Sequence, residues 1–577
     1  MSQVSCVGFV VEALSTQRTS TGSVSRALAY FPGLVRRSFV QGALKGEVWG
    51  HGDLASSVYV SATGELFVRV GSSPNRVSWD DLMSALAESV DDGLILPWEG
   101  RCLLVRISSD GTDITIWNDW CGGIPVYHVD SKEGPIIGTI EPAVVDEAGL
   151  GEDDFSPKGI VELLVHGHFI GTDTLYKKMR TLPPDTVSRW SNGMFLGSRQ
   201  LYSVKASDER WGRTDEDLID EMHALTVAAI RQAFSGIGSW ILPLSAGMDS
   251  RLCAAVAAQD KVDVRTYTYG HADWYEAVFA RQVARALSLP WRLVDIPPDY
   301  LVKYTSLWFD WFGASLHAHG MYQMPFLEAV RNVPGTIMQG YMGDPLAGNH
   351  LEAMYSGGRT PYERLCNFTQ HIPFDRVQEF VTFDARAILE EISEDVRKQY
   401  EEIQGADFQK MMFLDFRNRQ RNFIFYQAMM YDYVKGVATP FMNRAYANFC
   451  MSLPRPALEN RRLQKEMLRR RFTAMARIGG SFSREPLILT ARHRLRRFIG
   501  ERLPRFLRRG MFREFACLNN EVQKYALKKT GERALRPLNL HDAGEIPLLN
   551  PEPLSALIAS ASAADEHAYN ALRPVQT

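Results

Sequence analysis

Residues 239–258 read SWILPLSAGMDSRLCAAVAA, and this stretch decides the fold of the larger part of the chain. A short apolar run leads into a loop of small and hydroxyl side chains at 245–250, and an alanine-rich run follows. This order predicts a β-strand, a tight loop and an α-helix that begins near Asp249. Backbone N–H groups at such a helix start point at an anion, and the helix dipole adds partial positive charge. The loop is therefore expected to bind phosphate, although a capped turn between a strand and a helix uses the same residue types.

The segments around this unit alternate between strand and helix patterns. Predicted strands are VRTYTYG at 264–270, WRLVDIP at 291–297 and GTIMQG at 335–340, and predicted helices cover 214–234 and 274–289. Such alternation is typical of a doubly wound parallel sheet in an α/β protein. Beyond about residue 375 the pattern is mostly helical.

The first 200 residues have a different pattern, with short β-branched or aromatic runs between Gly, Asn, Asp and Ser. Examples are VSCVGFVV, ELFVRVG, RCLLVRIS and DITIWND, and Asn192-Gly193 predicts a hairpin turn. A polar, charged stretch at 203–216 has the composition of a linker. We therefore expect two domains, at 1–205 and 212–577, which a chain of 577 residues can accommodate.

The composition argues against several classes of protein. A net charge of −3 gives no electrostatic reason to expect nucleic acid binding. There is no apolar run of transmembrane length, so no integral membrane association is expected, and the N-terminus lacks the basic start of a signal peptide. The seven cysteines include no CxxC pair, which predicts a reducing, cytoplasmic environment and no zinc site.

A basic stretch at 487–513 contains nine arginines with interleaved Leu, Ile and Phe. This amphipathic pattern suits contact with an anionic partner, a peptide or a membrane surface. A solvated basic face whose apolar side packs on the domain is the favoured alternative.

A second glycine-rich loop, at 340–348, follows the predicted strand at 335–340. Ligands of doubly wound sheets bind at the carboxyl ends of strands, so two loops placed there face one pocket. Asp249 in the first loop and Asp344 in the second carry carboxylates that suit Mg²⁺ beside a phosphate. A plain Gly-Asp-Pro turn has the same sequence, so this motif alone is a weak signal.

Taken together, these segments resemble the asparagine synthetase family, which includes β-lactam synthetases and lasso-peptide cyclases. Residues 245–250 match the family's SGGxDS loop, with Ala246 in place of a glycine, and 340–344 look like its G-x-G-x-D loop. Glu276 before an A-x-x-V-A helix, and Lys465 in the tail ATPFMN…LP…KEMLR, follow in the family's order. The resemblance implies a PP-loop ATP pyrophosphatase domain with a helical C-terminal part.

The resemblance also implies an ATP-dependent, AMP-forming carbon–nitrogen ligase that uses Mg²⁺. A substrate carboxylate attacks the α-phosphate of ATP to form an acyl-adenylate, and an amine then attacks the carbonyl to make an amide. Mg²⁺ is assigned to Asp249 and Asp344. Lys465 is assigned as the catalytic lysine, with a solvated lysine in a basic helix as the alternative. The ATP and pyrophosphate site implied in this way comprises Leu244, Ser245, Ala246, Gly247, Met248, Asp249, Ser250, Tyr269 and Gly340.

Tyr341 is a departure from asparagine synthetases, which typically carry Glu between the first two glycines of this loop. It looks similar to β-lactam synthetases, in which a Tyr–Glu pair deprotonates the amine. A tyrosine needs a carboxylate partner to act as a base near neutral pH, and Asp375 and Glu352 are the candidates. A packed aromatic ring beside the loop is an equal alternative, and the departure weakens the case for aspartate as the substrate.

The N-terminal half resembles the class II glutamine amidotransferase domain of the same family, an Ntn-type α+β sandwich. The segment DWCGGIPVY at 119–127 looks like the family's D-x-x-G-x-x-P-L-Y, and residues 172–187 look like its T-x-f-x-x-I-x-x-L-x-P-G segment. The opening CVGFVV is similar to MCGIAGFV.

This half lacks the nucleophile that the active family needs, a Cys directly after the initiator Met. Residue 2 is Ser2, alignment on G-F-V puts Val4 at the nucleophile's place, and Cys6 falls inside a strand. Lys45 replaces the asparagine of the family's NGEIYN motif. We therefore expect no glutaminase activity, so that the amine comes from free ammonia or from the substrate itself.

Several alternatives stay open. The carboxylate belongs to aspartate, to a specialised metabolite or peptide that is cyclised, or to a uronic-acid sugar of a surface polysaccharide. A peptide or a biosynthetic-cluster protein as partner, and a homodimer, also stay open. A catalytically silent scaffold is the alternative from another class: Asp249, Asp344 and Lys465 argue against it, and Ala246 argues mildly for it. If the position of Ala246 requires positive φ, the alanine costs about 1 kcal/mol.

Overall fold

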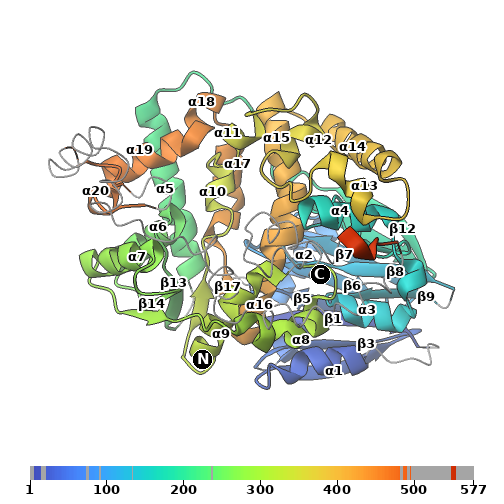
Figure 1. The fold of residues 1–577 in the computed structure, drawn as a ribbon. Helices are drawn as coiled ribbons and strands as arrows, with labels where there is room; N and C mark the ends of the chain where they lie inside the picture. Colours follow the sequence, from blue (N-terminus) through green and yellow to red (C-terminus); the bar gives the residue numbers. More distant parts are fainter. Residues whose placement is uncertain are drawn as a thin grey trace.

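The computed structural model describes residues 5–14, 21–52, 54–72, 77–89, 93–132, 134–235, 238–316, 318–480, 485–489, 494 and 548–553. Ser2, Val4 and nearly all of the basic stretch at 487–513 lie outside these residues. The described strands form two sheets, and a long helical segment runs between them (Figure 1). No described helix has both the length and the apolar composition needed to cross a membrane.

The first sheet is formed by twelve strands of the N-terminal part. These are β1 (Ser5–Ala13), β2 (Val35–Gln41), β3 (Leu44–His51), β4 (Val58–Val60), β5 (Leu66–Val70), β6 (Leu103–Ile107), β7 (Asp113–Asn118), β8 (Tyr127–Ser131), β9 (Gly134–Gly138), β10 (Met179–Thr181), β11 (Thr186–Ser191) and β12 (Met194–Gln200). The hairpin predicted at Asn192-Gly193 is present between β11 and β12, and both residues have positive φ, as its turn requires.

Strand β1 divides this sheet into two leaves. One edge of β1 pairs with β3, whereas the other edge meets β5 at Cys6 and β9 at Val10 and Val11. Strands β9, β8 and β10 continue one leaf, and β5, β6, β7, β11 and β12 continue the other. Buried side chains of both leaves pack together, among them Ile137 and Val105. The predicted α+β sandwich is therefore confirmed.

Four helices of this part were not predicted: α1 (Thr21–Ala29), α2 (Trp79–Glu88), α3 (Glu141–Ala148) and α4 (Pro157–His166). Leu82 of α2 packs on the leaf that contains β6 and β7, and Val144 of α3 packs against β8 and β9. Helices therefore cover both leaves from outside.

The second sheet has five strands, all of them parallel. They are β13 (Trp240–Pro243), β14 (Val264–Tyr269), β15 (Trp291–Val294), β16 (Thr336–Met338) and β17 (Val437–Ala438), in the order β15-β14-β13-β16-β17. The connecting helices are α5 (Asp215–Phe234), α6 (Met248–Gln259), α7 (Tyr275–Ala286), α8 (Tyr300–Phe312) and α9 (Met324–Val330). The predicted doubly wound sheet is confirmed. Strand β17 was not predicted, because a strand of two residues is too short to leave a recognisable sequence pattern.

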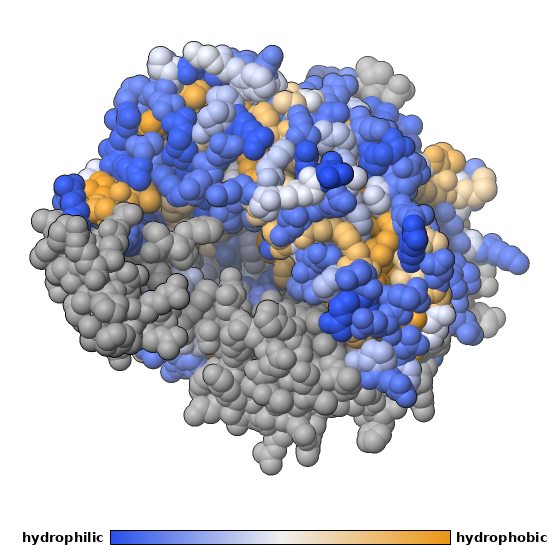
Figure 2. All heavy atoms as spheres, turned by 45° about the horizontal axis from the view of Figure 1, so that its top comes forward, coloured by the Kyte–Doolittle hydropathy of each residue, from blue (hydrophilic) through white to orange (hydrophobic). Residues whose placement is uncertain are grey.

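The rest of the described chain is mostly helical, as predicted. It contains α10 (Gly343–Leu346), α11 (Leu351–Met354), α12 (Pro361–Cys366), α13 (Val377–Phe380), α14 (Ala385–Glu402), α15 (Asp407–Asp415), α16 (Tyr426–Val434), α17 (Arg444–Met451), α18 (Arg455–Leu458), α19 (Arg462–Arg471) and α20 (Thr473–Ala476). A π-helix, η6 (Phe416–Phe425), joins α15 to α16. On the face of the molecule that Figure 2 shows, hydrophilic residues cover most of the described surface, and hydrophobic residues are exposed in smaller patches.

The segment formed by α15, η6 and α16 connects the two sheets. Arg421 of η6 donates hydrogen bonds to the carbonyls of Gly171 and Leu182 in the N-terminal part. Arg101 forms a buried ion pair with Asp432 of α16. π-Helices are rare and often occur at functional sites, so the residues on both faces of η6 are candidates for a functional role.

Candidate functional site

The candidate site lies where the order of the parallel strands reverses. The chain goes from β13 outward through β14 to β15 and then returns to β16 on the other side of β13. The loops that follow β13 and β16 therefore flank the switch point, which is where ligands of doubly wound sheets bind. These are the two loops that the sequence singles out.

The first loop leads into α6, a helix of 12 residues. The N–H of Ser245 donates to Ser250 Oγ at 3.2 Å, and the N–H of Gly247 donates to Ser245 Oγ at 3.0 Å. Gly247 is the N-cap residue and supplies no capping side chain. The start of α6 thus carries the hydroxyl groups of Ser245 and Ser250, and the cap residue provides no side chain to accept hydrogen bonds from the first N–H groups of the helix. Such an arrangement is suited to bind an anion.

Ala246 is accommodated without backbone strain. It is absent from the non-glycine residues with positive φ, so the cost that a left-handed alanine would carry does not apply. Its side chain is fully buried and packs against Tyr275 and Phe279 of α7. The alanine methyl group therefore joins the loop to the helix after β14.

Arg251 was missed in the sequence, where it reads as an ordinary helix residue. It is buried, and its guanidinium donates to the carbonyl of Ala246 at 3.1 Å and to that of Gly479 at 2.7 Å. It also donates to the carbonyl of Met475 at 2.8 Å. Arg251 thus ties the first loop to the segment that follows α20.

The glycines of the second loop allow it to pack directly on Asp249. A Cβ atom on Gly343 would lie 2.6 Å from Asp249 Cγ, and one on Gly340 would lie 3.0 Å from Asp249 Cβ. Met342 between them has φ of 70°, a left-handed conformation that is uncommon for a non-glycine residue. The two loops are therefore in contact, as expected for loops that share one ligand.

Asp249 and Asp344 are close enough to influence each other electrostatically. Burial, and to a lesser degree the charge of Asp344, raise the pKa of Asp249 to about 6, against the lowering effect of Arg461. Arg461 Nη2 lies 2.8 Å from Asp249 Oδ1, and Gln464 Nε2 donates to the same oxygen at 3.0 Å. Asn349 Nδ2 donates to Asp344 Oδ2 at 3.1 Å. Each carboxylate keeps one oxygen that makes no hydrogen bond to any residue described.

These residues line a cavity with a volume of about 360 Å³. Its walls include most of the predicted site residues: Leu244, Ser245, Gly247, Asp249, Ser250, Tyr269, Glu276, Gly340, Tyr341 and Asp344. Ala246, Met248 and Lys465 do not line it. Gln339 lines it as well, and its Nε2 atom is buried without a hydrogen-bond partner among the described residues. A buried, unsatisfied donor at this position indicates a polar ligand or a bound water.

The opposite wall comes from segments that the sequence did not suggest. His350, and Arg419, Gln420 and Ile424 of η6, line the cavity. Arg419 lies over Phe368 and Phe423, at 5.5 and 5.8 Å from the ring centroids, and makes no hydrogen bond or ion pair with a described residue. Asp415, whose Oδ2 lies 2.7 Å from His350 Nδ1, orients the imidazole. Nothing in the sequence pattern of 416–425 indicates a π-helix, so the sequence could not predict that residues of η6 line the cavity.

Tyr341 lines the cavity, but its surroundings are aromatic. Burial, together with Tyr322, raises its pKa, and Arg101 and Tyr431 act in the opposite direction. Neither Asp375 nor Glu352 is among the groups that shift it; Glu352 acts on Lys465 instead. The arrangement favours the packed aromatic ring over the base, and the catalytic role of Tyr341 stays a prediction.

Lys465 is placed beside the loops rather than in the cavity. Its Nζ donates to Asn460 Oδ1 at 2.6 Å. Partial burial and the charges of Arg461 and Arg469 lower its pKa. Its neighbours Arg461 and Gln464 make the contact with Asp249, so the catalytic role of Lys465 also stays a prediction.

In the N-terminal part, Cys6 is fully buried between the two leaves, and its thiol donates to the carbonyl of Gly8 at 3.3 Å. Asp119 of the DWCGGIPVY segment is a structural residue: its carboxylate accepts hydrogen bonds from the N–H groups of Cys102, Cys121 and Gly123. Ser2 and Val4, which lie where the family's nucleophile would fall, are outside the described residues, so the expected absence of glutaminase activity stays a prediction.

The donor set of the cavity fits Mg²⁺ only together with a phosphate. Among the described residues, no group of three or more His, Cys, Asp or Glu side chains is placed to hold a metal ion. Mg²⁺ usually binds one or two carboxylates and completes its shell with water and substrate phosphates. Asp249 and Asp344, each with one free oxygen, meet this requirement.

The parallel sheet and its switch-point cavity define an α/β protein with a candidate ligand site formed by two glycine-containing loops. Residues 227–477 match the family model described as asparagine synthase. The match includes both loops, Glu276 and Lys465. A search of curated proteins finds no match to this chain.

Two solved structures show a distant similarity. One is glutamine phosphoribosylpyrophosphate (PRPP) amidotransferase from B. subtilis complexed with ADP and GMP, with 9% identity and a TM-score of 0.23, covering 50% of this chain and 65% of that chain. The other is described as the allosteric regulatory enzyme of purine biosynthesis, with 9% identity and a TM-score of 0.21, covering 50% and 64%. The chain thus spans less than two thirds of either protein, and at these TM-scores the likeness supports no conclusion about activity.

Proposed function

We propose that this protein is an ATP-dependent ligase that releases AMP and pyrophosphate, adenylates a substrate carboxylate and forms an amide. One observation carries the proposal: the 245–250 and 340–344 loops meet at the switch point of a parallel sheet, inside the part of the chain that matches the asparagine synthase family model, and bring Asp249 and Asp344 together in one cavity. The residues of both loops that were assigned from sequence keep their proposed roles on this basis.

The roles follow from the chemistry of the wall. The N–H groups at the start of α6, with Ser245 and Ser250, bind phosphate oxygens. Asp249 and Asp344 hold Mg²⁺, which when bound neutralises phosphate charge and polarises the phosphoryl oxygens. Arg419, which makes no ion pair or hydrogen bond with a described residue, supplies positive charge from the opposite wall. Lys465 requires a rearrangement to reach the cavity.

The amine is proposed to come from ammonia or from the substrate itself, because Cys6 is buried and the N-terminal part supplies no accessible thiol in its described residues. The six described cysteines are all buried and form no disulfide with one another, which supports a reducing, cytoplasmic location. The substrate class stays among aspartate, a cyclised metabolite or peptide, and a uronic-acid sugar.

The experiment is ATP–pyrophosphate exchange with Mg²⁺, using aspartate, glucuronic acid and short peptides with a free side-chain carboxylate. We expect exchange with at least one carboxylate, its loss in Asp344→Asn, and normal exchange in Asp375→Asn, an exposed aspartate outside the cavity. Glutamine should not replace ammonia in amide formation, and Cys6→Ala should not change this.

A silent scaffold on the same fold is the second candidate, and the contact between Asp249 and Arg461 favours it. In a scaffold, this contact would be permanent. Absence of AMP formation with every carboxylate, together with unchanged nucleotide binding in Asp249→Ala, would establish the scaffold and reject the ligase.

A further inference from the structure

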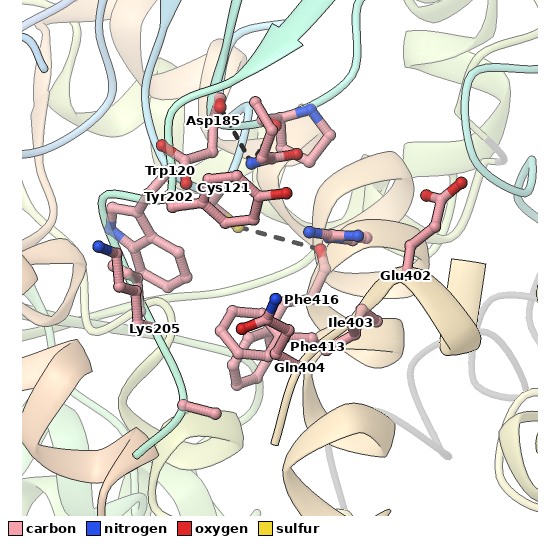
Figure 3. A pocket seen from close by; sticks show the side chains of 15 residues that line it. Trp120, Cys121, Asp185, Tyr202, Lys205, Glu402, Ile403, Gln404, Phe413 and Phe416 are labelled. Atoms are coloured by element: carbon pink, nitrogen blue, oxygen red, sulfur yellow. Dashed lines mark hydrogen bonds between the residues drawn. The ribbon is translucent and has the colours of Figure 1, made fainter. Parts of the chain in front are cut away.

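A second cavity lies between the N-terminal strands and the helices that flank it on the other side (Figure 3). Its volume is about 290 Å³. The turn after β7 and the segment after β12 form one wall, and the end of α14, α15 and the start of η6 form the other. It shares no lining residue with the cavity at the switch point.

The floor of this cavity is aromatic. Trp120 and Phe416 pack edge to face with ring centroids 6.1 Å apart, and Phe413 packs on Phe416 at 5.9 Å. The indole N–H of Trp120 donates to the carbonyl of Met442 at 2.8 Å, so the indole is fixed and its polar atom is satisfied. The floor therefore offers a preformed surface for an apolar group.

The rim carries charges of both signs. Arg417 and Glu402 line the cavity, and the negative charges of Asp185 and Glu402 both act on Arg417, yet neither Arg417 nor Glu402 makes a hydrogen bond or ion pair with any residue that the structure describes. Asp185, by contrast, is engaged, because its Oδ2 accepts the N–H of Ser203 at 2.9 Å. In Figure 3, Glu402 lies on the side of the cavity opposite Lys205. An arginine and a carboxylate that make no direct hydrogen bond or ion pair beside an aromatic floor are expected to bind complementary groups of a ligand.

We infer that this cavity binds a small zwitterion, an α-amino acid with a large apolar side chain. Its carboxylate would lie on Arg417, its ammonium group on Glu402, and its side chain against Trp120, Phe413 and Phe416. A nucleotide suits the cavity less well, because its several phosphate charges would face Glu402 and Asp185 with only Arg417 and Lys205 to balance them, whereas a zwitterion brings one charge of each sign. The volume lies at the lower end of the range of small-molecule sites, which excludes a folded partner or a long peptide.

The proposed amino-acid site takes no part in the proposed ligase reaction, but η6 connects it to the switch-point cavity. Arg417 and Arg419 lie on the same π-helix, two residues apart, and line the two different cavities. Occupation of one cavity can therefore affect the other through η6. Direct binding measurements test the inference without requiring any catalytic activity.

The test is isothermal titration calorimetry of the full chain with L-phenylalanine. Two analogues separate the charges: 3-phenylpropionate lacks the ammonium group, and phenethylamine lacks the carboxylate. We expect saturable binding of L-phenylalanine and affinities at least about tenfold lower for both analogues, since each loses a charge-assisted contact. Arg417→Gln and Glu402→Gln should lower the affinity for L-phenylalanine by a similar factor, whereas Arg417→Lys should lower it less.

The matched control is Arg386→Gln, because Arg386 is exposed and far along α14 from the cavity wall. It should bind as the unaltered protein does, and thermal melting confirms that each variant is folded. The inference is overturned if L-phenylalanine shows no saturable binding, if both analogues bind equally well, or if Arg417→Gln and Glu402→Gln leave the affinity unchanged. Competition by ATP that persists in Arg417→Gln would also overturn it, because the ligand would then occupy the switch-point cavity.

Discussion

Arg461 binds Asp249 through a side-chain contact of 2.8 Å that links the start of α19 to the first loop. The arginine is 5% exposed in its side chain and the aspartate 14%. Asn460 and Arg461 both have left-handed backbone, with φ of 52° and 56°, although arginine disfavours this region. A conformation with a cost of about 1 kcal/mol per residue persists only where surrounding contacts hold it, and such residues cluster at functional sites.

We therefore predict that Arg461→Gln destabilises the protein by about 3 kcal/mol, because it leaves a buried carboxylate beside Asp344 without its counter-ion. Asp249→Asn in the same chain should recover most of this loss. Thermal melting of the two single variants and the double variant measures the coupling. Additive effects of the two substitutions would show that the ion pair has no energetic role.

The contact between the second loop and Asp249 gives a second prediction. Gly343→Ala places a Cβ atom 2.6 Å from Asp249 Cγ and Oδ1, so the loops must separate. We expect a loss of about 1 to 3 kcal/mol in stability and a clear loss of nucleotide affinity, measured by calorimetry with Mg²⁺ and ATP. Gly33→Ala is the matched control, because a Cβ atom there meets nothing within 4 Å. Unchanged nucleotide binding in Gly343→Ala would show that the ligand does not depend on this packing.

The sequence predicted the switch point well and its opposite wall poorly, for a physical reason. Strand, loop and helix patterns are local, so they identified both loops from the residue types of 239–258 and 335–348 alone. Arg419 and Gln420 reach the cavity from a π-helix about 80 residues later, and neither a hydrophobic period nor a turn residue marks their place. Asp249 was predicted as a metal ligand, but its contact with Arg461 depends on two left-handed residues that the sequence does not indicate.

A pH dependence is expected in the N-terminal part, where Glu12 and Glu147 are both buried. Burial, together with Glu147, raises the pKa of Glu12 from 4.5 to about 8, and Lys45, 3.6 Å away, opposes this shift only in part. The folded protein therefore keeps the proton that the unfolded chain loses above pH 4.5, so stability falls as the pH rises from about 4.5 to about 8.

Glu12→Gln removes this ionisation and should change the pH profile of thermal melting. The difference in melting temperature between variant and unaltered protein should increase from pH 5 to pH 8, and the relative stabilisation should reach roughly 2 kcal/mol. Glu390→Gln, a change at an exposed glutamate on α14, is the control and should give a flat difference. A flat profile for Glu12→Gln as well would mean that Glu12 ionises normally in the folded state.

The last prediction separates the two roles of Tyr341. General base catalysis typically contributes 10²- to 10⁴-fold to a rate, whereas a packed ring that lacks only its hydroxyl contributes less. Since burial raises the pKa of Tyr341 and no carboxylate acts on it among the groups that shift that pKa, we expect Tyr341→Phe to lower amide formation by less than about tenfold. ATP–pyrophosphate exchange with the same carboxylate should be nearly unchanged. If exchange persists while amide formation falls by two orders of magnitude or more, Tyr341 deprotonates the amine, and the ligand-bound site must bring a carboxylate or another base to its hydroxyl.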